Sequence, residues 1–179
     1  RREHGFEWDT LQGEAIRERN PDLSPNYGFA AAVKDHGMIA SPGNYVGDLA
    51  NAFAAAGGEV TRANVKQVEP GDELIILKTD GGDIVAGKAV IAAGAWSHIL
   101  AERLGANVPL ESERGYHLEL TSANRQLTVP VMDAARKFVA TPMEGALRLA
   151  GLVEFGGLHA PASKGPSDLL VRGAKAMLP

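Results

Sequence analysis

EVTRANVKQVEPGDELIILKTDGGDIVA, residues 59–86, contains three apolar segments separated by two short turn sequences. The first turn is Glu69-Pro-Gly-Asp72 and the second is Asp80-Gly-Gly-Asp83. Proline and glycine at these positions favour β-turns, and a short glycine-containing connection between apolar segments is typical of a hairpin. The stretch therefore predicts three consecutive antiparallel strands.

Outward from this stretch, strands continue to outnumber helices. A serine cap and a proline at Ser41-Pro42, followed by apolar residues at helical spacing, predict a helix that ends at Gly57-Gly58 and buries one face. Another short helix is predicted between Asp9 and Pro21. Further strands are predicted at 88–93, 115–121, 128–132, 136–141 and 146–155, and further helices at 96–104 and 167–177.

The order of these elements predicts the fold class. Strands come in runs rather than alternating strictly with helices, which favours an α+β fold over a doubly wound parallel sheet. We expect a predominantly antiparallel or mixed sheet with flanking helices. The length of 179 residues and the 45% hydrophobic content suit a single domain, residues 1–179, with its own core.

Composition excludes several classes of function. The chain has no cysteine, so disulfides, thiolate nucleophiles and cysteine zinc sites are absent. A net charge of -4 with scattered Lys and Arg gives no basic surface for nucleic acid. No apolar run reaches the roughly 18–20 residues of a membrane helix, and no signal peptide opens the chain, so we expect a cytoplasmic location.

Common catalytic and phosphate-binding motifs are also missing. Neither G-x-G-x-x-G nor G-x-x-x-x-G-K-[ST] occurs, so the chain lacks a recognised pyrophosphate site. G-x-S-x-G and H-E-x-x-H are absent too, and the five histidines are too dispersed to predict a metal site. We therefore assign neither a metal ligand nor a catalytic acid, base or nucleophile.

Three segments carry a family resemblance. Val90-Ile-Ala-Ala-Gly-Ala-Trp-Ser97 is an apolar strand that ends in glycine, where a ligand can approach the backbone closely. Together with Pro109–Leu118 and Met143–Gly157, it resembles the FAD-dependent D-amino-acid oxidase and dehydrogenase family, and most closely the small subunit of bacterial D-amino-acid dehydrogenase. The resemblance runs from about residue 40 to residue 157. The three segments occur in family order, so together they are more specific than any one alone.

The resemblance implies FAD as cofactor. It implies that 88–97 is the strand that returns to the flavin domain, and that the segments completing that domain at each end are absent from this chain. The implied cofactor-binding residues are Val65, Ala93, Gly94 and Trp96. From the residues alone, a buried strand valine and a tight strand-to-helix turn with Trp96 packed beneath it explain these positions as well. By itself the segment should be inactive.

Arg148 is the main candidate for substrate binding. Period-two alternation places Arg148, Ala150, Leu152 and Glu154 on one face of the predicted strand. A guanidinium can hold a carboxylate through two parallel hydrogen bonds, and the resemblance makes Arg148 the carboxylate anchor. The alternative is a solvated arginine on an exposed sheet face.

Arg114 and Tyr116 form a second candidate group around Gly115. In the resembling enzymes this stretch leads into the sheet that covers the substrate pocket, which implies that both side chains line it. A half-buried strand tyrosine is the alternative. Glu154 is compatible with a structural pair to an arginine on a neighbouring strand.

The resemblance implies oxidative deamination of D-amino acids by hydride transfer from the α-carbon to flavin, giving a 2-oxo acid and ammonia. Two alternatives stay open: a non-catalytic module that binds a small carboxylated ligand or a protein, and a relative that acts on glycine or sarcosine. The sequence does not choose the substrate, or between oxygen and a membrane quinone as electron acceptor. The parent protein is compatible with peripheral membrane association, and an apolar surface left exposed would allow self-association.

Overall fold

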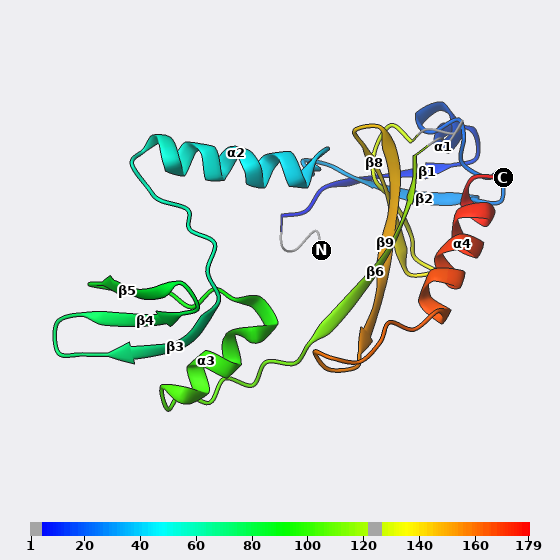
Figure 1. Cartoon of the computed structure of the whole chain (residues 1–179). Coiled ribbons are helices and arrows are strands. Elements are labelled where there is room, and N and C mark those ends of the chain that lie inside the picture. The colour runs from blue at the N-terminus through cyan, green and yellow to red at the C-terminus, as the bar shows by residue number, and fades with distance from the viewer. Residues whose placement is uncertain (1–4, 122–126) are drawn as a thin grey trace. The chain divides into compact units, whose positions relative to one another are not determined.

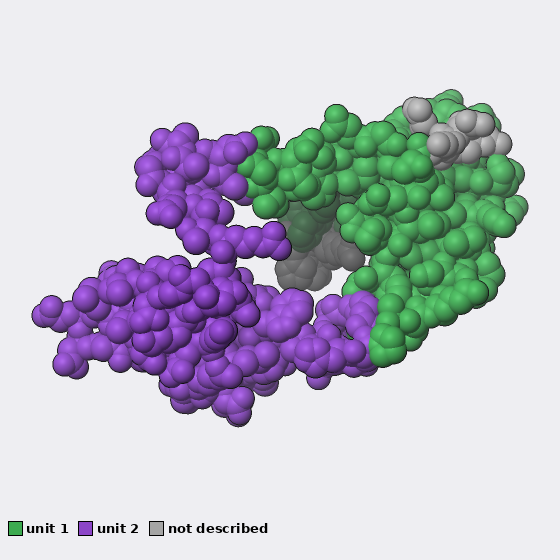
Figure 2. All heavy atoms as spheres, viewed as in Figure 1, with its two compact units in different colours: residues 1–48, 115–154, 161–179 green, residues 49–114, 155–160 purple. Residues whose placement is uncertain are grey.

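The computed structural model describes residues 5–121 and 127–179. It confirms an α+β fold with antiparallel sheets and few helices. The chain forms two compact units, coloured separately in Figure 2: unit 1 comprises residues 1–48, 115–154 and 161–179, and unit 2 comprises residues 49–114 and 155–160. The single domain expected from the sequence stays a prediction, and each unit is described below by itself.

Unit 1 is built on a four-stranded sheet with the order β6-β9-β8-β7. The strands are β6 (Glu113–Leu120), β7 (Val131–Asp133), β8 (Phe138–Met143) and β9 (Ala146–Phe155). β8 and β9 form an antiparallel hairpin in which Ala140 lies opposite Leu149. The strands predicted at 115–121 and 146–155 are confirmed. The strand predicted at 128–132 begins three residues later and is shorter, and the strand predicted at 136–141 lies two residues further along the chain.

Helix α4 (Gly165–Met177) covers one face of this sheet (Figure 1). Phe138, Ala140 and Leu149 alternate along their strands toward the helix and are at most 2% exposed. Gly173 allows the closest approach, because a Cβ there would lie 2.6 Å from the Phe138 ring. The buried cluster of unit 1 contains Ile16, Leu23, Tyr116, Leu127, Phe138, Ala140, Leu147, Leu149, Leu170, Ala174 and Met177.

The start of unit 1 differs from the sequence prediction. The predicted helix between Asp9 and Pro21 is shorter, α1 (Glu14–Arg19), and residues 8–12 form strand β1 (Trp8–Gln12). β1 pairs antiparallel with β2 (Phe29–Val33). Residues 8–12 form a strand instead of the start of the helix because β2 supplies hydrogen-bond partners for their backbone groups.

Unit 2 contains the three-stranded sheet predicted from residues 59–86. Its strands are β3 (Val65–Pro70), β4 (Ile75–Thr79) and β5 (Gly82–Ala86), in the order β3-β4-β5 with antiparallel pairing. β3 is therefore shorter than predicted and begins at Val65. A short 3-10 helix η2 (Gly94–Trp96) and helix α3 (Ser97–Arg103) complete the unit and confirm the helix predicted at 96–104.

Two other predictions are wrong. Helix α2 (Pro42–Ala55) forms as expected but buries no residue, and Val46, Leu49 and Phe53 are each more than 50% exposed. Residues 88–93 form no strand, because no described segment pairs with their backbone. In both cases the described residues supply no partner element: none of them buries the apolar side chains of α2, and no strand pairs with residues 88–93. None of the described helices is long and apolar enough to cross a membrane.

Candidate functional site

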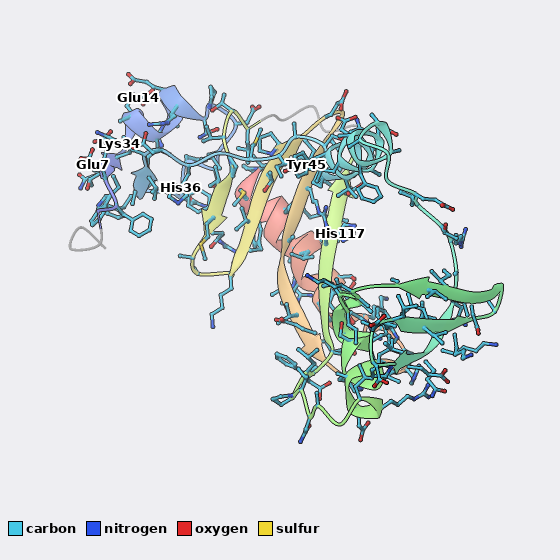
Figure 3. The ribbon with its side chains drawn as sticks, turned by 90° about the vertical axis from the view of Figure 1, so that its left-hand side faces the viewer. Glu7, Glu14, Lys34, His36, Tyr45 and His117 are labelled. Carbon is cyan, nitrogen blue, oxygen red and sulfur yellow. The ribbon has the colours of Figure 1, made fainter. Side chains whose placement is uncertain are left out.

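Among the described residues of unit 1, no helix or strand covers the face of the sheet opposite α4 (Figure 3). In Figure 3 helix α4 lies behind the sheet, so this face is turned toward the reader. Because Phe138, Ala140 and Leu149 point toward α4, the residues that alternate with them point away. On β6, Tyr116 points toward the buried cluster, so Gly115 and His117 on either side of it face the other way. The uncovered face is formed by Gly115, His117, Glu119, Val139, Thr141, Arg148 and Ala150.

Arg148 lies on the uncovered face, where it pairs across the strands with Thr141. Cross-strand partners project from the same side of a sheet, so a guanidinium and a hydroxyl stand side by side there. Arg148 is half-buried. Among the described residues, it is the only arginine that the strands of this sheet direct to the uncovered face.

The predicted alternation along β9 is wrong beyond Ala150. Gly151 has φ 144, a conformation that L-residues with side chains rarely adopt, and a Cβ there would lie 2.7 Å from Lys137 O. This irregularity, of the kind seen in β-bulges, shifts the phase of the strand. Leu152 therefore packs against the buried cluster, and Glu154 binds the core residue Tyr116 instead of standing beside Arg148.

Tyr116 is 9% exposed, and its polar atom is occupied by other parts of the chain. Its hydroxyl donates to Glu154, and it accepts a hydrogen bond from the Ser163 backbone N–H at 2.7 Å. The Ser163 hydroxyl also donates to Glu154. Arg114 donates to the backbone oxygen of Ala160. Both side chains thus form hydrogen bonds with the segment that precedes α4. Direct contact of Arg114 and Tyr116 with substrate stays a prediction.

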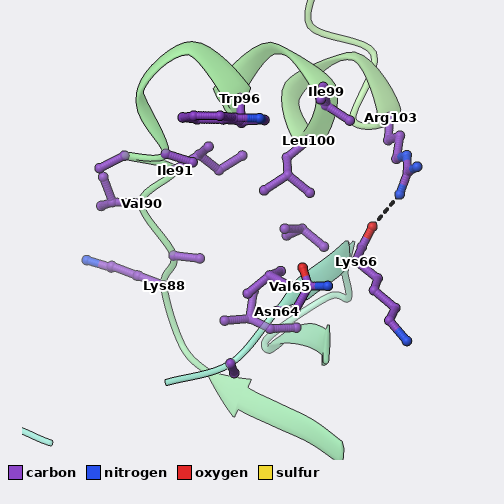
Figure 4. Close-up of a pocket in the computed structure, with 16 residues that line it drawn as sticks. Asn64, Val65, Lys66, Lys88, Val90, Ile91, Trp96, Ile99, Leu100 and Arg103 are labelled. Atoms are coloured by element: carbon purple, nitrogen blue, oxygen red, sulfur yellow. Dashed lines mark hydrogen bonds between the residues drawn. The ribbon is translucent and has the colours of Figure 1, made fainter. Parts of the chain in front are cut away.

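Unit 2 contains a pocket of about 1020 Å³, here called the unit 2 pocket. Three of the four predicted cofactor-binding residues, Val65, Ala93 and Trp96, line it. In Figure 4 Trp96 and Val65 lie on opposite sides of the pocket. Gly94 follows Ala93 and begins η2 with φ 56, which allows the tight turn from residues 88–93 into the helix. The structure therefore brings together segments that are about 28 residues apart in sequence.

The unit 2 pocket fits part of a flavin dinucleotide. Its lining is largely aliphatic apart from Trp96, with Ile91 and Leu100 adding to the apolar wall, which suits a planar ring. The lining also includes residues 88–93, and no described strand pairs with their backbone. The cations near it are Lys66, Lys88 and Arg103, and Arg103 donates to the Lys66 backbone oxygen. No glycine-rich pyrophosphate motif accompanies them, so these residues fit an adenine or isoalloxazine ring better than the phosphates.

A buried polar group that sequence reasoning missed lies at the β7–β8 turn. Asp133 is 2% exposed, and Tyr27 donates to its carboxylate at 2.6 Å while Arg136 donates at 2.7 Å. Burial acts to raise the pKa of Asp133, but the hydrogen bonds from Tyr27 and Arg136 and the Arg136 charge lower it overall. Burial and the bond to Asp133 raise the pKa of Tyr27. This group joins distant parts of unit 1 and has no contact with the uncovered face.

His117 and Glu119 were also missed as site candidates. Both lie on the uncovered face, with Nε2 of His117 3.8 Å from Oε1 of Glu119. The alternation of apolar residues from Tyr116 to Leu120 is a signal that could have placed them there. Among the described residues, no group of three or more His, Asp or Glu could hold a metal ion.

The comparisons with known proteins identify the family. Residues 1–179 match the family described as FAD dependent oxidoreductase. The chain belongs to this family. A D-amino-acid oxidase from Bradyrhizobium diazoefficiens is 34% identical over 180 residues, which cover all of this chain and 43% of that protein. A D-amino acid dehydrogenase from Dechloromonas aromatica is 27% identical over 153 residues, covering 84% of this chain and 34% of the relative.

Solved structures of an oxidase and a dehydrogenase share the fold. Glycine oxidase from Geobacillus kaustophilus superposes with a TM-score of 0.79 at 23% identity, over 99% of this chain and 48% of that one. L-proline dehydrogenase from P. horikoshii gives a TM-score of 0.80 at 19% identity, with coverage of 96% and 48%. The chain thus spans less than half the length of each of these four proteins.

Proposed function

We propose that this chain is the substrate-binding part, with the segment 88–97 that returns to the flavin domain, of an FAD-dependent D-amino-acid oxidase or dehydrogenase. The observation that carries the proposal is the half-buried Arg148 on the uncovered face of the unit 1 sheet. The family match and the two relatives named for D-amino acids support the reaction class over a non-catalytic binding module.

In the proposed reaction the α C–H bond breaks and its hydrogen leaves with both bonding electrons. The substrate nitrogen loses a proton and forms a C=N bond, and water then converts the imino acid to a 2-oxo acid and ammonia. Bound FAD would supply the oxidant that accepts the hydride. The unit 2 residues Val65, Ala93, Gly94 and Trp96 would hold part of it.

The role of this chain's residues is to orient the substrate. Arg148 would hold the substrate carboxylate through a two-pronged hydrogen bond, with the Thr141 hydroxyl beside it. Fixing the carboxylate limits rotation of the α-carbon, which is the contribution that such an anchor makes to rate. Tyr116 and Arg114 would support the site indirectly, because their polar atoms bind the segment before α4. No titrating side chain is needed for the hydride step.

Replacing Arg148 tests the proposal. In the flavin-loaded full-length protein that contains this chain, Arg148→Leu should raise KM for D-amino acids by about 10- to 100-fold, because a charge-assisted pair is lost. The fall in kcat should be smaller. Reduction of a dye acceptor makes the assay independent of oxygen or quinone as natural acceptor.

Arg172→Leu is the matched control, because Arg172 is an exposed arginine on α4, which covers the opposite face of the sheet. Equal kinetics for the two variants would remove Arg148 from the site. Failure of the wild type to oxidise any D-amino acid would refute the proposed reaction.

A second candidate is a glycine or sarcosine oxidase. A monomeric sarcosine oxidase from Arthrobacter sp. is 25% identical over 114 residues, covering 63% of this chain and 29% of that protein. The same carboxylate anchor would serve glycine or sarcosine. Comparing kcat/KM for D-alanine, glycine and sarcosine distinguishes the two, and a tenfold preference for either of the last two would favour this second candidate.

A further inference from the structure

The uncovered face carries a second charge that the proposed reaction does not use. On β6, Tyr116, Leu118 and Leu120 belong to the buried cluster or pack against it, so His117 and Glu119 point the other way. Figure 3 shows His117 on the side of the sheet opposite α4. β6 is the direct neighbour of β9, the strand that carries Arg148. A carboxylate and a guanidinium therefore lie on the same face of adjacent strands.

Glu119 retains the capacity to bind a cation. Its side chain is 49% exposed, and His117 Nε2 is 3.8 Å away, which is longer than a hydrogen bond. An ionised carboxylate offers about four acceptor positions, so one distant imidazole leaves most of them available. Among the described residues of this sheet, the charged or titratable groups on the same face as Glu119 are His117 on its own strand and Arg148 on the next.

The charge arrangement suits a zwitterion. Adjacent strands lie about 4.8 Å apart, and Glu119 and Arg148 both carry long side chains on the same face of the sheet. Arg148 would bind a carboxylate, and Glu119 would attract an ammonium group. In an amino acid that group is either the α-ammonium or an ammonium at the end of the side chain.

We infer that Glu119 is a specificity-determining residue that binds an ammonium group of the same amino acid whose carboxylate Arg148 binds. The inference rests on the proposed function and extends it from a carboxylate anchor to two-point recognition. It gives the uncovered face a preference for ligands with both charges over simple carboxylates.

Three ligands of equal chain length test the inference in the flavin-loaded full-length protein. D-Lysine has both ammonium groups, D-norleucine has only the α-ammonium, and hexanoate has neither. For the two amino acids the measured quantity is kcat/KM, and for hexanoate it is the inhibition constant. Glu119→Gln should lower kcat/KM for D-lysine at least tenfold and change hexanoate inhibition less than about twofold, because only the charge-assisted bond is removed. Glu119→Asp should recover part of the D-lysine activity.

Glu14→Gln is the control variant, since Glu14 is a 78% exposed carboxylate on α1 of the same unit. Figure 3 shows Glu14 on α1, away from the strand that carries His117. D-Norleucine identifies the source of the ammonium: an equal loss in kcat/KM indicates the α-ammonium, and no loss indicates the side-chain group.

Two results would overturn the inference: D-lysine kinetics equal to those of the control, or equal weakening of hexanoate. Flavin content and circular dichroism equal to wild type show that Glu119→Gln is folded. If Glu119→Gln does not fold, the D-lysine kinetics of Glu119→Asp test the inference instead. If the wild type oxidises no D-amino acid, the proposed function fails. If it does and Glu119→Gln matches the control, only the role of Glu119 fails.

Discussion

Substitution of Gly151 by alanine should destabilise unit 1 more than any surface change, because it acts on the backbone irregularity that orients β9. Gly151 has φ 144, and a Cβ there would lie 2.7 Å from Lys137 O and 2.8 Å from Phe138 Cα. Lys137 ends the turn before β8, and Phe138 is the first residue of β8. Both neighbouring atoms belong to the backbone, so they cannot rotate away. Either β8 and β9 separate locally or β9 loses its phase shift.

The magnitude follows from two costs. Holding an L-residue in a sparsely populated backbone region costs about 1–3 kcal/mol. Forcing an extra methyl group into a packed site costs about 1–3 kcal/mol more. Gly151→Ala should therefore lower the free energy of unfolding of unit 1 by about 2–6 kcal/mol. Gly145, in the β8–β9 turn, has φ 74 and no atom within 4 Å of an added Cβ, so Gly145→Ala should cost only about 1–2 kcal/mol.

Urea unfolding of the chain measures the difference. Trp8 lies in unit 1 and Trp96 in unit 2, so a Trp96→Phe background leaves Trp8 fluorescence as the report on unit 1. With a slope of about 1–3 kcal/mol/M, Gly151→Ala should lower the urea midpoint by on the order of 1–2 M. A midpoint equal to that of Gly145→Ala would show that the phase of β9 does not depend on Gly151.

Three further predictions rest on the pKa shifts and on the missing pyrophosphate motif: two concern stability against pH, and one concerns cofactor retention. The folded-state pKa of Asp133 is lowered, so its contribution is present above the unfolded pKa of about 3.9 and is lost as the pH falls through the lower folded value. Asp133→Asn should flatten the fall in urea midpoint between pH 7 and pH 3, and an unchanged profile would contradict this. The pKa of Tyr27 is raised, so its contribution should decline above about pH 10, and Tyr27→Phe should remove that decline. Mixed with FAD and passed through gel filtration, the chain should retain no dye, because it has no pyrophosphate motif; stoichiometric flavin absorbance in the protein peak would contradict this.

Elements that depend on nearby residues could be predicted from the sequence. Strands β4 and β5 are joined by Asp80-Gly81 between Thr79 and Gly82, and this turn chemistry is contained in the sequence itself. The same holds for α3 and α4. Strand β1 was missed because its partner, β2, lies about 20 residues away, and no local pattern reports a distant ladder.

The candidate site could be predicted only in part. The family resemblance predicts Val65, Ala93 and Trp96 as cofactor-binding residues, and the structure places all three in the unit 2 pocket. The error at Glu154 has a different origin, because residues 149–153 contain no polar side chain that would mark a change of phase in the sequence. The shift follows from the positive φ of Gly151. A glycine in the sequence does not predict it, because glycine adopts both a regular strand conformation and a positive φ.

Helix α2 has a consequence for how long this polypeptide survives in a cell. A helix of 14 residues with no buried side chain gains little free energy from packing, and helices of that length are marginal in water. Its backbone should open often, and proteases cut opened segments first. Turnover would then be governed by whether another surface covers Val46, Leu49 and Phe53, whatever the stability of the two sheets.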